Sequence, residues 1–119
     1  MNEIKFSNFE YETLVANDVA IISFKGDIHK RDNEIHENCI SEVMMLEAHF
    51  FILNFNKVTK IDNSGHRFIA MIQKTIRDKE NCRVLHCYVD DSAWRILHSQ
   101  GILKDSERKR DIIECLKIK

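Results

Sequence analysis

The chain has 119 residues and a mass of 14.1 kDa, which is the size of a single domain. Its 44% hydrophobic and 31% charged residues argue against intrinsic disorder, and its net charge of −1 argues against a nucleic-acid partner. The longest apolar run, residues 68–72, is far shorter than the about 20 residues of a membrane-spanning helix, so no direct membrane insertion is expected.

The compartment is predicted from the N-terminal segment and the cysteines. Residues 1–12 lack the apolar core of a secretion signal, so we expect a cytoplasmic protein with free thiols. None of the four cysteines forms a CxxC pair, and we expect no metal site and no cofactor. Cys82 and Cys87 read as small buried hydrophobic residues, and the six scattered histidines as mostly surface or half-buried side chains.

Strand-like and helix-like segments alternate along the chain. After a lead-in over residues 1–10, two strand-like runs flank the turn residues Asn17 and Asp18 and predict a hairpin, and Gly26-Asp27 is expected to end its second strand. The run 50–55 is apolar and too short for a core helix, so it reads as a strand of a parallel sheet, followed by a polar loop over 56–63. The predicted elements are strands over 11–16, 19–24, 50–55, 83–89 and 102–103, and helices over about 32–48, 64–79, 92–100 and from about 106.

This order predicts one α/β domain over 11–117 with a small mixed sheet of four or five strands and about four helices. Asp32 or Asn33 is expected to cap the first helix, and Asp90, Asp91 or Ser92 the third. Two further interpretations concern the C-terminal third. Trp94 and Leu97 read as core, and the basic run 108–110 as a solvated helix face.

No enzyme template fits the sequence. It lacks the GxxxxGK[ST] phosphate loop, the GxGxxG fingerprint, the GxSxG elbow and the HExxH helix. Ser64 with a histidine is compatible with a hydrolase in principle, but nothing in the sequence positions His66 to activate Ser64. We therefore expect a binding protein and not an enzyme.

The most informative segment is 60–66, which follows the buried strand and opens a helix. In the simpler interpretation Ser64 is only the N-cap of that helix and Asp62 is a solvated loop residue. In the functional one, a kinase phosphorylates the Ser64 hydroxyl. The added charge of about −1.5 to −2 would be tolerated by the helix N-terminus and repelled by Asp62 and by an acidic partner surface.

The stretch FFILNFNKVTKIDNSGHRFIAMIQ (50–73) resembles the signature of the STAS domain, the anti-sigma factor antagonist family. The segments ISFKGDI (22–28) and SAWRILHSQGILK (92–104) are similar to the family's second strand with its Gly-Asp turn and to its C-terminal third. The resemblance extends over residues 11–117 and implies a sheet with helices packed mainly on one side.

The resemblance also implies a function. Small members bind a partner, often a serine kinase that is an anti-sigma factor. The kinase ends the antagonism by phosphorylating the loop, and a phosphatase restores it. Ser64 matches the phosphoacceptor, Asp62 the preceding acid and Gly65 the following glycine, so this chain would be the kinase's substrate and regulate transcription through signal transduction. Asp62 is expected to orient the Ser64 hydroxyl.

Several positions depart from the family pattern or extend the predicted interface. Asn63 and His66 replace the usual Ser and Leu, Arg67 follows them, and Asn54 replaces a common Asp. His66 is expected as an exposed first-turn residue, or as one that tunes partner choice or contacts a phosphate. Asp27, in the Gly-Asp turn, is assigned to the partner interface with these loop residues.

Three alternatives stay open: a structural STAS subunit of a lipid-transport ATPase complex or stress-signalling scaffold, nucleotide binding through the same loop, and an unrelated enzyme. The oligomeric state is not predicted.

Overall fold

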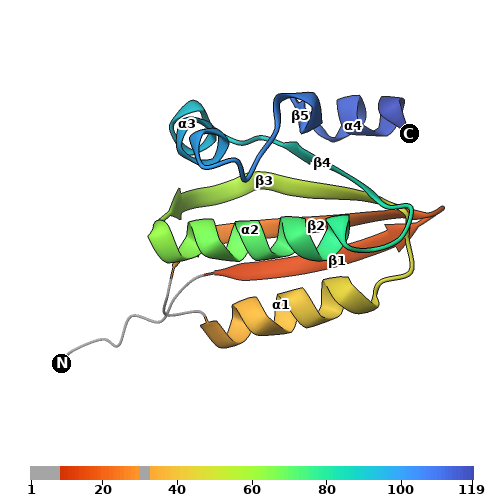
Figure 1. Cartoon of the computed structure of the whole chain (residues 1–119), viewed down its shortest axis with the longest axis horizontal. Coiled ribbons are helices and arrows are strands. Elements are labelled where there is room, and N and C mark those ends of the chain that lie inside the picture. Colours follow the sequence, from red (N-terminus) through yellow and green to blue (C-terminus); the bar gives the residue numbers. More distant parts are fainter. Residues whose placement is uncertain (1–8, 30–32) are drawn as a thin grey trace.

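The computed structural model describes residues 9–29 and 33–119, which form an α/β domain around a five-stranded mixed sheet (Figure 1). The strands lie side by side in chain order, with β1 antiparallel to β2 and the other neighbours parallel. They are β1 (Glu10–Ala16), β2 (Val19–Ile28), β3 (Phe50–Ile61), β4 (Arg83–Cys87) and β5 (Arg108–Lys109). The predicted fold class is confirmed.

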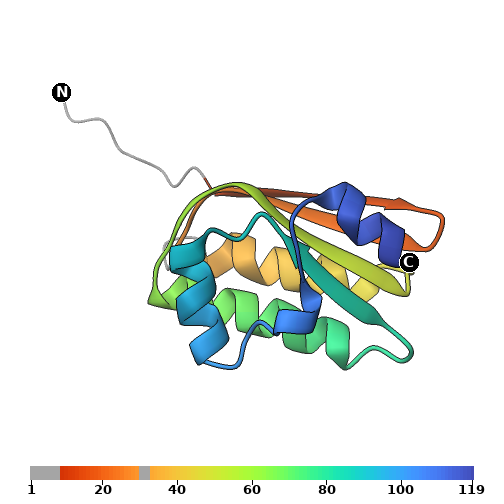
Figure 2. The ribbon, with the colours of Figure 1, turned by 90° about the horizontal axis from the view of Figure 1, so that it is seen from above.

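The helices cover the two faces of the sheet unequally. They are α1 (Asn33–Met45), α2 (Asn63–Arg77), α3 (Asp91–Ser99) and α4 (Ile112–Ile118), and a 3-10 turn covers Asp105–Glu107. The first three lie on one face, whereas α4 lies over the other (Figure 2). The main core therefore joins α1, α2 and α3 to the sheet, and a smaller cluster around Cys115 joins α4 to Ile52 and Leu85.

The β1–β2 hairpin is confirmed at the predicted turn. Asn17 and Asp18 have φ of 50° and 68°, so both central residues are left-handed, as in the turns that suit the twist of a two-residue hairpin. Ala16 then pairs with Val19 across the turn. The strand preceding the turn begins one residue earlier than predicted, and Phe9 before it is buried in the main core.

β2 and β3 are both longer than predicted. β2 continues through Gly26, whose φ is 88°, to Ile28, with two shifts in its register against β3. The predicted loop over 56–63 is wrong because β3 continues to Ile61. Its second half pairs with β2 alone, since β4 pairs only with residues 50–54. One edge of this half is unpaired within the sheet, which explains its polar sequence.

The C-terminal third differs most from expectation. No strand forms at 102–103, where Leu103 is instead buried in the main core, and β5 forms within the basic run 108–110. The guanidinium of Arg108 lies 4.5 Å from the ring centre of Trp94, so the run is not a helix face. The last helix begins only at Ile112, because Asp111 is its N-cap and accepts a hydrogen bond from the amide of Glu114.

The structure buries more histidines than the sequence led us to expect. His36, His66 and His86 are buried, so three of the six histidines lie inside the fold. Of the cysteine pair singled out, Cys87 is buried and Cys82 is half-buried; all four cysteines are free thiols. Leu97 is core as predicted, and Trp94 is half-buried beside it. Asp32, one of two predicted caps of α1, lies outside the described residues, and Asn33 is the first residue of that helix.

Candidate functional site

The turn between β3 and α2 consists of one residue, Asp62. Its amide donates a hydrogen bond to the carbonyl of Ile28 at the end of β2, at 3.1 Å. Its carboxylate accepts one from the amide of Gly65 at 2.8 Å, which makes Asp62 the N-cap of α2. The predicted cap at Ser64 is therefore wrong: β3 extends to Ile61 and α2 begins at Asn63, so Asp62 occupies the cap position and Ser64 lies inside the helix.

Gly65 brings the first turn of α2 into direct contact with the sheet. A Cβ at this position would lie 2.3 Å from the carbonyl oxygen of Ile28 and 2.7 Å from a methyl carbon of Ile61. The same carbonyl accepts the Asp62 amide, so the ends of β2 and β3 and the start of α2 share one contact point. The glycine matched by resemblance thus has a packing reason of its own.

Ser64 is the second residue of α2 and is half-buried. With Arg67 and Met71 it lines a hollow of about 250 Å³ between α2 and the start of α1, where Asn33 and Glu37 form the other wall. Asn63, the first helical residue, is exposed beside it. Ser64 is therefore on the first turn of α2 and faces an open surface hollow.

The surroundings of Ser64 determine how an added phosphate would be received. The first four amides of a helix and its dipole favour a negative charge there, by about 0.3–1 kcal/mol at an exposed position. Arg67, three residues further along α2, lines the same hollow and offers a guanidinium, whereas Glu37 on α1 is an acid in its wall. The helix N-terminus and Arg67 thus favour a negative charge at Ser64, and Glu37 opposes it.

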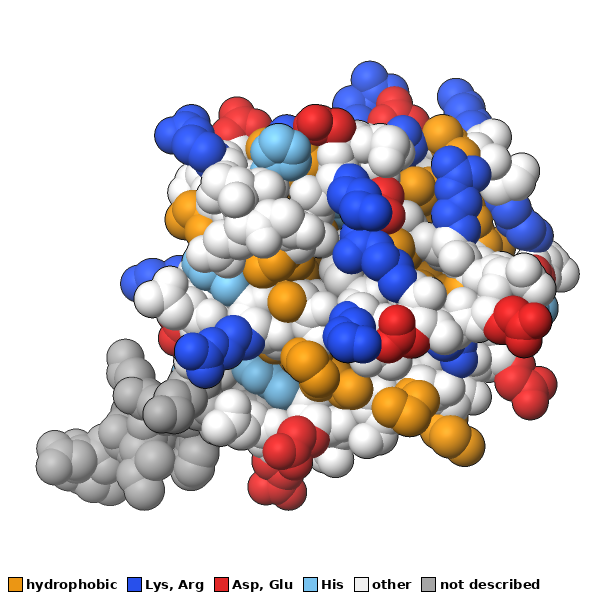
Figure 3. Space-filling model, viewed as in Figure 1, with side chains coloured by type: hydrophobic (Ala, Val, Ile, Leu, Met, Phe, Trp, Pro, Cys, Tyr) orange, Lys and Arg blue, Asp and Glu red, His pale blue; other side chains and the backbone are white. Residues whose placement is uncertain are grey.

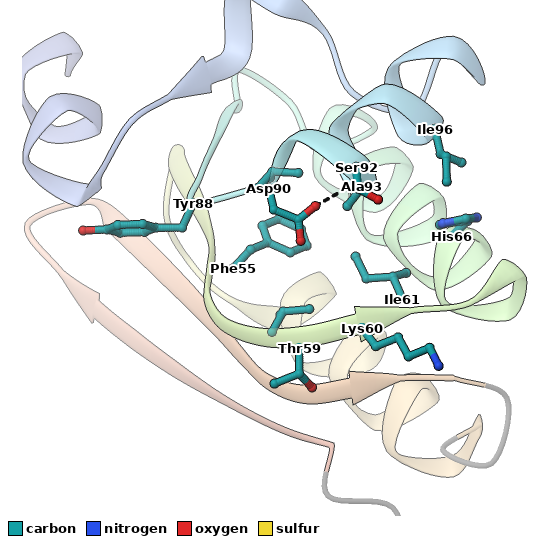
Figure 4. Close-up of a pocket in the computed structure, with 12 residues that line it drawn as sticks. Phe55, Thr59, Lys60, Ile61, His66, Tyr88, Asp90, Ser92, Ala93 and Ile96 are labelled. Atoms are coloured by element: carbon teal, nitrogen blue, oxygen red, sulfur yellow. Dashed lines mark hydrogen bonds between the residues drawn. The ribbon is translucent and has the colours of Figure 1, made fainter.

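His66 lies on the other side of α2 from Ser64. It is only 6% exposed and lines a separate cavity, in which its ring lies between Ile61 and Ile96 (Figure 4). Burial lowers the pKa of His66, and nearby Asp62 opposes that shift only partly. The expectation of an exposed histidine is wrong, and because Ser64 and His66 line different hollows, the structure does not bring them together as a Ser–His pair.

Asp27 and Asn54 each connect β2 to β3, Asp27 near the Asp62 end of these strands and Asn54 in the first half of β3. Asp27 accepts a hydrogen bond from the hydroxyl of Thr59 and comes immediately before Ile28. The amide nitrogen of Asn54 donates to the Ser23 hydroxyl at 3.1 Å, which joins β3 to β2. The structure thus places Asp27 beside the Asp62 turn, whereas Asn54 has a cross-strand role.

Hydrophobic side chains are exposed over α1 and α2, on the face that carries Ser64. Met44, Met45 and Met71 are 57%, 78% and 48% exposed, and basic side chains lie among the hydrophobic ones on this face (Figure 3). Methionine adapts its shape readily to a partner surface. Met is among the residue types enriched at protein–protein interfaces, so these three methionines are the interface-like feature of this face.

Within the described ranges, no three His, Cys, Asp or Glu side chains gather in a way that could hold a metal ion. No helix in the described part of the chain has both the length and the apolar character needed to cross a membrane.

Solved structures share this architecture. An anti-sigma factor antagonist from Mycobacterium paratuberculosis superposes with a TM-score of 0.77 over 93% of both chains, at 14% identity. The anti-sigma factor antagonist SpoIIAA in its unphosphorylated form gives 0.71 over 92% of this chain and 94% of its own, at 13% identity. The chain has the fold of the STAS domain.

The same fold recurs inside a larger protein. The murine solute carrier 26 family member A9 anion transporter matches 96% of this chain with 22% of its own, at a TM-score of 0.72 and 16% identity. Scans of protein-family models and of curated proteins find no match to this sequence. The expected fold is thus confirmed by structure, with three helices on one face and α4 on the other.

The sequence did not reveal several residues of the site. The role of the Ile28 carbonyl could not be predicted, because every residue has a backbone carbonyl and the sequence does not mark which one makes this contact. His66 had a usable signal: His66, Ile69, Gln73 and Ile76 recur at three- and four-residue spacing and are all buried. That spacing places His66 on the inner side of α2.

Proposed function

We propose that this protein is a phospho-switched binding module of the anti-sigma factor antagonist type, with Ser64 as the phosphoacceptor. The observation that carries the proposal is the position of Ser64 at the second residue of α2, half-buried in a surface hollow that it shares with Arg67 and the exposed Met71. A phosphate there would change the charge of a binding surface while the Asp62 cap and the Gly65 contact keep the fold intact.

The comparisons support this role through fold. SpoIIAA is known in an unphosphorylated and a phosphorylated form, and both forms match this chain. By analogy we propose a serine kinase-type anti-sigma factor as partner, a phosphatase that reverses the modification, and a cytoplasmic site of action in transcription control. The kinase supplies nucleotide, metal and catalytic groups, and this chain is its substrate.

The partner interface is proposed to comprise the turn residues and their neighbours. Asn63 and Arg67 are exposed on the same helical turn as Ser64 and would contact the partner directly. Asp62 and Gly65 would act by fixing the geometry of that turn. Asp27 would contribute from the end of β2, whereas His66 faces away from Ser64 and is left out of this surface.

A second candidate is a structural STAS subunit of a transport complex or a signalling scaffold. The observation that favours it is the recurrence of the fold as 22% of an anion transporter chain. In that role the exposed methionine face would be covered permanently, and the charge at Ser64 would not control binding.

A paired capture experiment separates the two candidates. Wild-type protein, Ser64→Asp and the equally charged control Ser106→Asp are immobilised and incubated with native cell extract, and retained proteins are identified by mass spectrometry. Ser106 is exposed in the 3-10 turn, whose Glu107 pairs with Arg77 at the opposite end of α2 from Ser64. A kinase held by wild type and by Ser106→Asp but lost with Ser64→Asp supports the switch. The same partners on all three support the structural subunit and contradict the switch.

A further inference from the structure

A second hollow lies on the opposite side of α2 from Ser64. It has a volume of about 270 Å³ and is bounded by the end of β3, the start of α2 and the segment that leads from β4 into α3 (Figure 4). This is the carboxyl end of two parallel strands, where open α/β sheets commonly bind ligands. The volume is slightly below the roughly 300–1,000 Å³ of sites for drug-sized molecules, so an occupant would be small.

His66 is a polar residue in the cavity wall whose ring nitrogens have no hydrogen-bond partner among the described residues. The residue is only 6% exposed, and both ring nitrogens are buried. Buried polar atoms are paired in the great majority of cases. Gln73 and His86 also have unpaired side-chain atoms, but of these three residues only His66 lines this cavity. The ring lies between Ile61 and Ile96, where a molecule in the cavity would meet its edge.

The walls define the chemistry of the occupant. Phe55, Ile61 and Ile96 provide apolar surface. Lys60 and Asp90 place one charge of each sign on the walls, and the Asp90 carboxylate already accepts a hydrogen bond from the Ala93 amide as the cap of α3, so the walls favour no net ionic charge. Burial also keeps His66 in its neutral form, because it lowers the pKa of the ring. A neutral imidazole offers one donor and one acceptor on nitrogens that point in different directions; a hydroxyl or an amide can pair with either of them, whereas a carboxylate can only accept from the donor.

We propose that this cavity binds a small uncharged molecule that carries a hydroxyl or amide group on an apolar body, with His66 as its hydrogen-bonding partner. The site is distinct from the Ser64 surface and does not depend on phosphorylation. One further feature agrees with a ligand site. Tyr88 at the cavity wall has a φ of 63°, which bulky residues rarely adopt, and such strain concentrates at ligand clamps.

The test uses the full chain and defined probes. p-Cresol and benzamide, which carry the hydroxyl and the amide, are titrated against the protein while NMR follows the ring nitrogens of His66. Toluene is the matched control without a polar group, and benzoate is the anionic control. We expect at least one polar probe to bind saturably and to shift the His66 signals. Toluene and benzoate should bind at least tenfold more weakly than that probe.

Variants assign the site. His66→Phe keeps an aromatic ring without nitrogens and should lower the affinity for the polar probe at least tenfold. The control is His49→Phe, at an exposed histidine paired with Asp18, which should leave this affinity unchanged. Ser92→Met narrows the cavity from the wall formed by α3, leaves α2 untouched, and should also weaken binding. The proposal is overturned if neither polar probe saturates, if toluene or benzoate binds as tightly, or if folded His66→Phe and Ser92→Met both bind like wild type.

Discussion

The α-carbon of Gly65 lies so close to the carbonyl oxygen of Ile28 that a Cβ on it would come within 2.3 Å of that oxygen. The contact fixes the first turn of α2, and with it Ser64, against the end of β2. In an ordinary helix, Gly→Ala stabilises a protein by about 0.5–1 kcal/mol. Here we expect the opposite sign.

Gly65→Ala should lower the free energy of unfolding by about 1–3 kcal/mol, because the clash is with backbone that cannot rotate away. Urea unfolding measures this change. Gly101→Ala is the control, because a Cβ there meets nothing within 4 Å. Its cost should come only from the left-handed backbone, with φ of 75°, and amount to about 1 kcal/mol. A Gly65→Ala protein more stable than wild type would contradict the close approach.

Ser64 should be nearly neutral for stability, since Asp62 and not Ser64 is the cap of α2. Loss of a true cap costs about 0.5–2 kcal/mol, so Ser64→Ala should cost less than about 0.5 kcal/mol. Ser64→Asp should gain about 0.3–1 kcal/mol at low salt from the helix N-terminus. Thermal and urea unfolding check both values. A cost above about 1 kcal/mol for Ser64→Ala would show that its hydroxyl does cap the helix.

Asp62 combines a capping role with a negative charge, and two substitutions separate them. Asn caps helices as well as Asp does, so Asp62→Asn should retain nearly wild-type stability, whereas Asp62→Ala should lose about 0.5–2 kcal/mol. If the charge contributes to phosphoryl transfer, Asp62→Asn should still be phosphorylated more slowly by the captured kinase. Equal rates for Asp62→Asn and wild type would remove the charge from the mechanism and leave only the cap.

His86 should make the protein acid-sensitive. It is fully buried, and burial, with smaller effects from Arg108, Arg77 and Lys109, lowers its pKa to about 3. Between that value and the unfolded pKa of about 6.5, the unfolded chain binds a proton that the folded chain does not. The free energy of unfolding should therefore fall by about 2 kcal/mol from pH 7 to pH 5 on this account alone.

His86→Leu tests the assignment, because it retains an apolar core side chain and removes the titrating group. Urea unfolding at pH 7 and pH 5 should show a smaller loss for the variant than for wild type. His66, whose pKa is also lowered by burial, remains in both proteins and accounts for the dependence that persists. If wild type and His86→Leu lost the same free energy of unfolding between pH 7 and pH 5, a group other than His86 would cause the acid sensitivity.

The sequence predicted those parts of the fold whose signals are local. Asn17-Asp18 specifies a hairpin by turn chemistry, and the apolar residues of α2 recur at helical spacing. The second half of β3 was missed because its pairing with β2 is a long-range contact that leaves polar residues on the strand. β5 has only two residues, and their pairing with His86 and Cys87 leaves no pattern in the sequence.

The candidate site was predicted unevenly for the same reason. Ser64, Asp62 and Gly65 were found through resemblance to a family signature. The resemblance did not show which of them caps α2 and which contacts the sheet. Which residue caps α2 depends on where β3 ends, and β3 ends six residues later than its apolar run indicated. The inward direction of His66 could have been predicted from its spacing with Ile69, Gln73 and Ile76, but the first turn of α2 considered alone does not show it.

The central claim is that a kinase partner phosphorylates Ser64. The most direct measurement incubates the full chain with the captured kinase and Mg-ATP and locates the phosphate by peptide mass spectrometry, with Ser64→Ala and Ser106→Ala in parallel. The account predicts one phosphate, on Ser64, in wild type and Ser106→Ala, and none in Ser64→Ala. Phosphate on another residue, equal labelling of Ser64→Ala, or no transfer at all would contradict it.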